Sequence, residues 1–429
     1  MKRKGRKLSA GTLMMVLLTI AVLIGSALFA IRFSSGSLTD VKKTPVSARD
    51  TTVTGQKNVR RDDGESVVTT GPGQPDGNDT AAPADEQPGN PSVRSFTLTI
   101  AGTVAVEGEV RKNCYVSEVK TYDFSDIMSL LQSELHADLN IVFFENVLSG
   151  NGKISDTAAP DQAAELLKAA GIHIAACGFS KAWAAEDTGI VHTREVLSSY
   201  GITPVGIYAP NDGSGINILM RNGVRIAVLQ YTDSINETTR KKMTRKDQTM
   251  TVPPADADLI SSNIAEARSL GAEAVIVLIS WDKVGKKQKT LAQQAADAGA
   301  DLIIGCGTRT PLETETLHTV LPDGSSREVI CVWSLGTVLS GEQKNIRNRS
   351  GYLLHVRIET DGSGYASVAE PAYTPLYTWR YKQDGRVYYR CLAANRPVPD
   401  GMDSDQQKSM EKAAATVQGA MENHLLTER

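Results

Sequence analysis

The sequence predicts an α/β fold in which helices cover a β-sheet on both faces, preceded by one transmembrane helix. Two observations point to the fold. From residue 95 onward, apolar runs of strand length alternate with segments of helical periodicity. The apolar runs are also continuous, without the polar residue at every second position that a half-exposed strand shows, and such strands are typical of a sheet buried on both faces. A third observation is an uncharged run near the N-terminus, which predicts the transmembrane helix.

The uncharged run comprises 24 residues, Leu8–Ile31. As a helix it would extend about 36 Å, enough to cross a hydrocarbon core of about 30 Å. Five basic residues precede it and only Arg32 follows closely, so the N-terminus is expected in the cytoplasm and the rest outside. A cleaved signal peptide is the alternative, because Gly25 and Ala27 are small enough for a cleavage site. The length of the run favours an uncleaved anchor in the lipid bilayer.

Composition divides the chain further. Residues 1–33 form the basic cytoplasmic tip and the anchor, and residues 34–94 are poor in bulky apolar side chains and rich in Pro, Gly and Asp. A segment of this kind cannot bury enough surface to offset its ordering entropy, so we expect a disordered extracytoplasmic spacer. The α/β domain is expected over 95–398, and a C-terminal amphipathic helix within 399–429.

Charge and cysteine content exclude some functions. The formal net charge is −3, and the first 33 residues hold six basic residues and no acidic one, which leaves −9 for the rest. An acidic body is a poor nucleic-acid binder, so no nucleic-acid partner is expected. The five cysteines form no CxxC pair. Cys177, Cys306 and Cys331 lie in apolar runs and are predicted to be buried core thiols.

The elements of the α/β domain follow one another along the chain. Strands are predicted over 96–106, 139–148, 172–179, 225–232, 274–281, 301–307 and 327–336. Helices are predicted over 124–135, 161–171, 257–271 and 289–299. The last two predicted strands, 352–361 and 365–376, have no helix between them, so we expect an antiparallel section to complete the domain.

In an α/β sheet, ligands bind where strands end and loops begin. The strand ends are therefore the candidate site of this chain. They are Gly102-Thr103, Glu145-Asn146, Gly178 to Lys181, Ser280 to Asp282, Gly305 to Arg309, and Ser334 to Thr337.

These strand ends, in this order, make the chain similar to the CapA family of poly-γ-glutamate capsule synthesis proteins. The resemblance covers about residues 96–376 and rests on ordered local matches over 137–148, 170–206, 271–282, 297–315 and 332–340. It implies a four-layer α/β/β/α sandwich resembling metallo-dependent phosphatases, with a metal centre at the strand ends.

The chain departs from the family pattern at the metal-ligand positions. The family's Gly-Asp, Asn-Leu-Glu, Asn-Asn-His, His-Trp-Gly and His-Pro-His motifs align with Gly102-Thr103, Phe143-Phe144-Glu145, Phe179-Ser180-Lys181, Ser280-Trp281-Asp282 and Gly307-Thr308-Arg309. Of the expected ligands only Glu145 is retained. Glycine offers no ligand atom, and lysine and arginine repel a cation. The six histidines all lie elsewhere in the sequence.

The resemblance therefore implies a pseudoenzyme that keeps the fold without metal or other cofactor. The positions in question are Thr103, Glu145, Ser180, Lys181, Ser280, Asp282, Gly307 and Arg309. The alternative is an active metal-dependent hydrolase with a rearranged site, in which Asp282 supplies one of the new ligands.

Lys181 and Arg309 occupy two of the former ligand positions. Fixed cations there could replace the lost metal ions and bind an anionic group, with Glu145 paired to one of them. The alternative is an internal salt bridge that fills a disused site. The sequence leaves both open.

The C-terminal segment has Met410, Ala414, Val417, Met421 and Leu425 at helical spacing, which predicts an amphipathic helix. It is expected to dock onto its own domain, and a contact with a partner protein is the alternative.

Together these inferences predict a membrane-anchored, extracytoplasmic protein of the bacterial envelope. From the family resemblance we expect a non-catalytic binding or scaffolding component in the synthesis, export or attachment of an anionic surface polymer such as poly-γ-glutamate. Its expected partners are the bilayer, the polymer and other capsule-synthesis membrane proteins.

Overall fold

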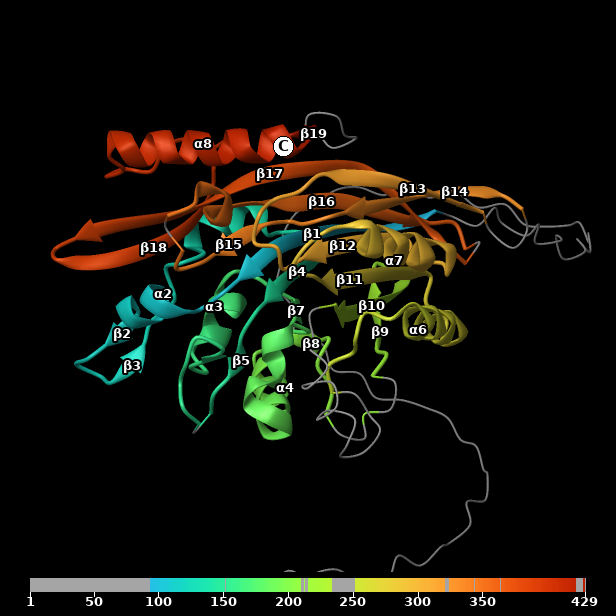
Figure 1. The fold of residues 1–429 in the computed structure, drawn as a ribbon, viewed down its shortest axis with the longest axis horizontal. Helices are drawn as coiled ribbons and strands as arrows, with labels where there is room; N and C mark the ends of the chain where they lie inside the picture. Colours follow the sequence, from blue (N-terminus) through green and yellow to red (C-terminus); the bar gives the residue numbers. More distant parts are fainter. Residues whose placement is uncertain are drawn as a thin grey trace, which may run out of the picture. The chain divides into compact units, whose positions relative to one another are not determined.

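The computed structural model describes residues 93–150, 152–209, 212, 215–233, 251–320, 324–342, 344–362, 364–421 and 427–428 (Figure 1). The predicted anchor and almost all of the predicted spacer lie outside these residues. Within the described ranges, no helix has the length and apolar character needed to cross a membrane.

Two β-sheets form the centre of the domain (Figure 1). The first contains, in order, β18 (Arg386–Ala393), β17 (Ala366–Gln383), β16 (Ser350–Thr360), β1 (Arg94–Val104), β4 (Leu139–Phe144), β7 (Ile174–Ala176) and β8 (Thr203–Val205), with β15 (Thr337–Leu339) beside β1 and β19 (Thr427–Glu428) beside β17. The second contains β13 (Thr314–Val320), β14 (Ser326–Val332), β12 (Leu302–Cys306), β11 (Ala274–Ser280), β10 (Val224–Thr232) and β9 (Ile218–Arg221).

Each sheet has a parallel half. Strands β1, β4, β7 and β8 are parallel, as are β10, β11, β12 and β14. The remaining long strands are antiparallel, and β16 pairs with both β1 and β17 in that direction. The predicted antiparallel section after the last α/β crossover is therefore confirmed.

Helices cover the outer faces of both sheets. Side chains of α3 (Ala163–Ala169) and α4 (Glu186–Ser199) share one apolar core with the first sheet, and those of α6 (Ala257–Ser269) and α7 (Lys286–Asp297) share another with the second. A third core, including Ile141 and Ile276, lies between the sheets. The layers are thus helix, sheet, sheet, helix, which is the arrangement that the family resemblance implied.

This layering explains why the strand sequences are continuously apolar. In β11, Ile276 and Leu278 point into the core between the sheets, whereas Val275 and Val277 point into the core under α6 and α7. All seven residues of the strand are buried. Because neither face meets water, no polar alternation is needed.

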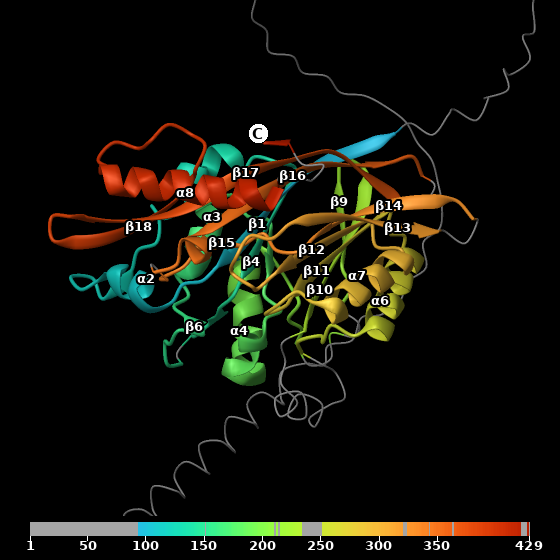
Figure 2. The same cartoon turned by 45° about the horizontal axis from the view of Figure 1, so that its top comes forward.

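The C-terminal helix α8 (Ser404–Met421) lies along β17 (Figures 1 and 2). Met410 packs with Tyr377 and Trp379, and Val417 and Met421 join the core between the sheets. The predicted docking of this helix onto its own domain is confirmed. Leu425, the last residue of the predicted apolar stripe, lies outside the described residues.

One predicted helix is wrong. Residues 124–135 form turns and the short 3₁₀ helix η1 (Ser129–Glu134) instead of an α-helix. The carbonyl of Ile127 accepts a hydrogen bond from the backbone N–H of Cys391 on β18, which takes it out of a helical hydrogen-bond pattern. Tertiary pairing therefore overrides the local propensity.

Several short elements complete the chain. They are α2 (Gly108–Asn113), β2 (Tyr115–Val116), β3 (Thr121–Tyr122), β5 (Val147–Leu148), β6 (Ala158–Ala159), η2 (Ser180–Ala185) and η3 (Ile346–Arg349). The cysteine prediction is confirmed, because Cys177, Cys306 and Cys331 are free thiols with buried side chains.

Candidate functional site

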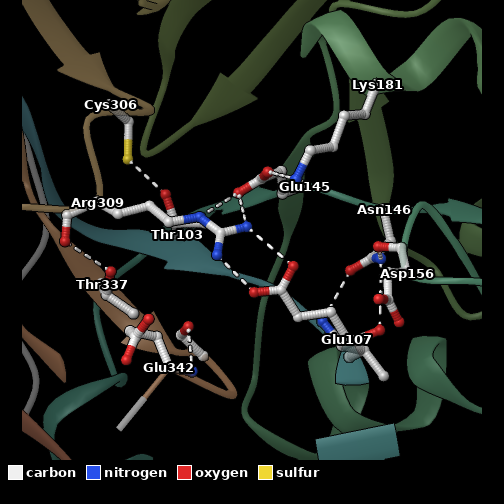
Figure 3. Close-up of polar contacts among 12 residues, drawn as sticks. Thr103, Glu107, Glu145, Asn146, Asp156, Lys181, Cys306, Arg309, Thr337 and Glu342 are labelled. Atoms are coloured by element: carbon white, nitrogen blue, oxygen red, sulfur yellow. Dashed lines mark hydrogen bonds and ion pairs between the residues drawn. The ribbon is translucent and has the colours of Figure 1, made fainter. Parts of the chain in front are cut away.

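Four of the predicted site residues lie close together where strands of both sheets end (Figure 3). Thr103 is near the end of β1, Glu145 directly follows β4, and Lys181 lies in η2 beyond β7. From the second sheet, Arg309 follows β12. Parallel strands bring their carboxyl ends to the same edge, which is why residues more than 160 positions apart become neighbours.

Glu145 is at the centre of these contacts. Its Oε1 accepts a hydrogen bond from Lys181 Nζ at 2.6 Å. Its Oε2 accepts two from Arg309, at 3.0 Å from Nε and 2.8 Å from the second terminal nitrogen. The Glu145 side chain is only 9% exposed, so the two cations compensate a carboxylate that has little contact with water.

Glu107 is the second carboxylate of this group. It lies just after β1 and accepts from both terminal nitrogens of Arg309, at 3.1 Å in the longer of the two contacts. Arg309 therefore uses its planar fork on two carboxylates at once, as arginine geometry favours. We refer to Glu107, Glu145, Lys181 and Arg309 as the site cluster (Figure 3).

The backbone before Arg309 has an unusual conformation. Gly307 has φ +108°, and a Cβ added there would lie 2.7 Å from the carbonyl oxygen of Trp281. A side chain at this position would need both strain and movement of the neighbouring strand end. Arg309 itself has φ +59°, and its carbonyl accepts a hydrogen bond from Thr337 Oγ1 at 2.8 Å. Glycine at position 307 therefore allows the turn that carries Arg309.

The electrostatics of the site cluster favour the charged form of the arginine. Burial alone would lower the pKa of Arg309, but the hydrogen bonds and charges of Glu107 and Glu145 outweigh burial, so its pKa is raised. The cluster pairs two carboxylates with two cations and so has no formal net charge. Lys181 is its most accessible member, with a side chain 39% exposed against 20% for Arg309.

Thr103 and Cys306 lie beside the Arg309 side chain (Figure 3). Thr103 Oγ1 lies 3.0 Å from Cys306 Sγ, and both side chains are buried. Burial raises the pKa of the Cys306 thiol to about 12, so the thiol stays protonated at neutral pH. Neither side chain therefore offers an anionic ligand.

The remaining predicted positions have separate environments. Ser280 is buried, and its hydroxyl accepts from Gln230 Nε2 at 3.2 Å. Gln230 also bonds the backbone of Gly178 on the other sheet, accepting from its N–H at 2.8 Å. Ser280 thus belongs to a polar link between the sheets. Asp282 is exposed in the loop after β11, and Ser180 begins η2 partly buried.

The donor set does not fit the dinuclear metal centre that the fold family implies. The converging groups are two carboxylates, an ammonium and a guanidinium, and the cations occupy the carboxylate oxygens that a metal ion would need. Within the described part of the chain, no three His, Cys, Asp or Glu side chains converge as a metal-binding group. Metal sites of this kind need several such donors around each ion.

Sequence reasoning missed two residues of the site, Glu107 and Gln230. Glu107 follows the first strand by three residues, so the rule that ligands bind at strand ends pointed to its neighbourhood. Gln230 gave a different signal, as a polar residue within the mostly apolar strand β10. A buried polar side chain of this kind needs a partner, which only the fold identifies.

The fold and site define a class: an α/β/β/α sandwich with a salt-bridge cluster where strands of both sheets end. The chain belongs to the family described as bacterial capsule synthesis protein PGA_cap, whose sequence profile matches residues 97–342. That match begins within β1 and ends in the loop after β15, and so includes every residue of the site cluster.

Parts of this chain are similar to known proteins. The PGA biosynthesis protein CapA of Bacillus subtilis (strain 168) is 26% identical over 190 residues, which are 42% of this chain and 46% of that protein. This chain therefore matches about half the length of that relative. A hypothetical protein from Thermus thermophilus superposes with a TM-score of 0.36 at 15% identity, over 68% of this chain and 99% of the other. The calcineurin-like phosphoesterase YfkN from Bacillus subtilis gives 0.35 at 9% identity, over 77% and 99%.

Proposed function

We propose that this protein is a membrane-anchored, extracytoplasmic component of capsule synthesis that binds or scaffolds an anionic polymer without catalysing a metal-dependent reaction. The observation that carries the proposal is the site cluster. In this cluster Arg309 and Lys181 both bind Glu145. On this proposal the two cations stand where the family's metal ligands would be. The polymer role is taken from family membership and from the biosynthetic role in the name of the Bacillus subtilis relative.

Lys181 is the group that supports polymer binding. An ammonium has three N–H donors, and the contact with Glu145 uses one of them. With its side chain 39% exposed, the ammonium can contact a carboxylate or phosphate from outside. Arg309 contributes positive charge behind it, although both of its carboxylate partners compete with a ligand.

Metal content tests the non-catalytic part of the proposal. Full-length protein, purified in detergent without added metal, should contain well under one equivalent of any transition metal by elemental analysis. EDTA should leave its melting temperature unchanged, because metal that binds the folded state contributes to its stability. A stoichiometric metal, or a fall of several degrees in EDTA, would support the alternative of an active hydrolase with a rearranged site.

Topology is a separate prediction, motivated by the charge asymmetry around Leu8–Ile31. Protease added to intact protoplasts should digest the α/β domain and leave only a small membrane-bound fragment. A cytoplasmic protein of the same cells should stay intact as the control. Full protection of the α/β domain would show that it is not extracytoplasmic.

A further inference from the structure

A pocket lies between helix α4 and the segment that joins β5 to β6. Its volume is about 470 Å³, and its lining includes Ser149, Gly150, Lys153, Thr157, Thr188 and His192. It shares no residue with the site cluster. Both places lie beyond the carboxyl ends of first-sheet strands, where α/β sheets bind ligands, because β5 begins two residues after Glu145.

His192 lines this pocket and is oriented by Asp161. Its Nε2 lies 2.9 Å from Asp161 Oδ2, and the other oxygen of Asp161 accepts from the backbone N–H of Gly150 at 3.1 Å. Gly150 has φ +53°, and a Cβ there would lie 2.9 Å from His192 Nε2. The loop backbone therefore packs directly on the imidazole. Because Nε2 faces Asp161, Nδ1 is the ring nitrogen left to meet a ligand.

Lys153 supplies positive charge to the pocket. Its side chain is exposed, and it makes no hydrogen bond or ion pair with any described residue. The hydroxyl of Ser149 likewise has no hydrogen-bond partner among the described residues. By contrast, the hydroxyls of Ser155 and Thr157 bond each other at 3.0 Å. An ammonium, a hydroxyl and an imidazole nitrogen are thus free to contact a ligand in one pocket.

The backbone N–H groups of this pocket indicate which kind of anion it can bind. Sites for phosphate usually present several free backbone N–H groups. Here the N–H of Gly150 is bonded to Asp161, and that of Gly152 is bonded to the Ser149 carbonyl at 2.7 Å. A single ammonium balances the one negative charge of a carboxylate, whereas a phosphate group carries up to about two.

We propose that this pocket binds a carboxylate ligand that has an O–H or N–H donor a few atoms away, as in a hydroxy acid or an amino acid. Lys153 Nζ and the Ser149 hydroxyl contact the carboxylate. A neutral His192 donates from Nε2 to Asp161 and accepts the ligand's donor at Nδ1. The inference does not depend on the proposed function, because none of these residues belongs to the site cluster.

Calorimetry on the full-length protein in detergent tests the proposal with L-lactate, L-glutamate, acetate and inorganic phosphate as probes. L-Lactate and L-glutamate should bind, acetate should bind more weakly, and phosphate should not bind. Lys153→Met should weaken L-lactate binding about tenfold or more, as expected for the loss of a charge-assisted contact. Lys412→Met, which removes an exposed lysine on α8, is the matched control and should bind as the unmodified protein does.

Two further variants separate the roles of the other groups. Ser149→Leu fills the pocket without changing charge and should abolish binding. His192→Phe keeps the ring shape and should remove the preference for lactate over acetate while keeping weak carboxylate binding. In lysine acetylation mapped by mass spectrometry, bound lactate should protect Lys153 and leave Lys412 reactive. The proposal is overturned if no carboxylate binds, if phosphate binds instead, or if Lys153→Met and Ser149→Leu bind lactate normally.

Discussion

The two ends of strand β12 each have a charge cluster that joins the two sheets, and the two clusters differ in burial. Asp301, just before the strand, is 1% exposed and accepts from Arg268 at 2.7 Å, from Arg327, and from the backbone N–H groups of Val275 and Ala366 at 2.6 and 3.1 Å. The site cluster, just after the strand, contains a lysine side chain that is 39% exposed.

The difference in burial distinguishes a charge network that is only structural from one that a ligand can reach. At Asp301 the acceptor positions are filled by the protein itself, with backbone donors from both sheets. A solute has no access to such a carboxylate. In the site cluster, Glu145 is buried in a similar way, but the cation that faces it remains accessible. The ion pair between Glu145 and Lys181 can therefore stabilise the fold and still leave the ammonium accessible to a ligand.

The largest expected effect is the loss of the buried cluster. Asp301→Ala leaves Arg268 and Arg327 without their shared carboxylate, and removing one partner of a buried ion pair costs about 3–5 kcal/mol. Denaturant unfolding of the full-length protein measures the loss. Asp405→Ala, which removes an exposed carboxylate paired with Lys408, should change stability by no more than about 0.5 kcal/mol. If the two variants are equally stable, Asp301 has no structural role.

A smaller loss of stability is expected at the site cluster. Arg309→Met should cost about 1–3 kcal/mol, because Glu145 keeps Lys181 as its partner and Glu107, with a side chain 18% exposed, can be hydrated. Arg386→Met, at an exposed pair with Glu118, is the matched control and should have little effect. A loss equal to that of Asp301→Ala would mean that the site cluster is as structural as the buried one.

The smallest effect on stability, and the clearest effect on binding, is expected at Lys181. Lys181→Met should cost no more than about 1 kcal/mol of stability, because the side chain is partly solvated. At low salt it should weaken binding of poly-glutamate about tenfold or more, and Arg309→Met should do the same. The difference from the unmodified protein should shrink at high salt, where its binding is screened.

The matched control for this binding measurement is Lys408→Met on α8, which removes an exposed lysine with one carboxylate partner. It should bind poly-glutamate as the unmodified protein does. If Lys181→Met also binds normally, or if the unmodified protein binds no polyanion, the site cluster is only an internal salt-bridge network.

Most strand and helix positions followed from local patterns. Residues 274–281 and 301–307 were predicted as buried strands, and the structure has β11 and β12 there. The error at 124–135 has a tertiary cause, since a backbone bond from Cys391 decides the local conformation. Strand β9 was not predicted, and the hairpin formed by β17 and β18 was predicted only in part. The apolar pattern of these strands is weak or mixed with polar residues.

At the site, local patterns in the sequence predicted which residue types stand at the strand ends, including Glu145, Lys181 and Arg309. Two of these three residues are cations, which repel a metal ion. Their hydrogen-bond partners became known only from the fold. Glu107 entered the site because Arg309, in a left-handed backbone conformation, places its guanidinium between two carboxylates. Contacts between residues about 200 positions apart depend on how the two sheets pack, and no local pattern specifies that packing.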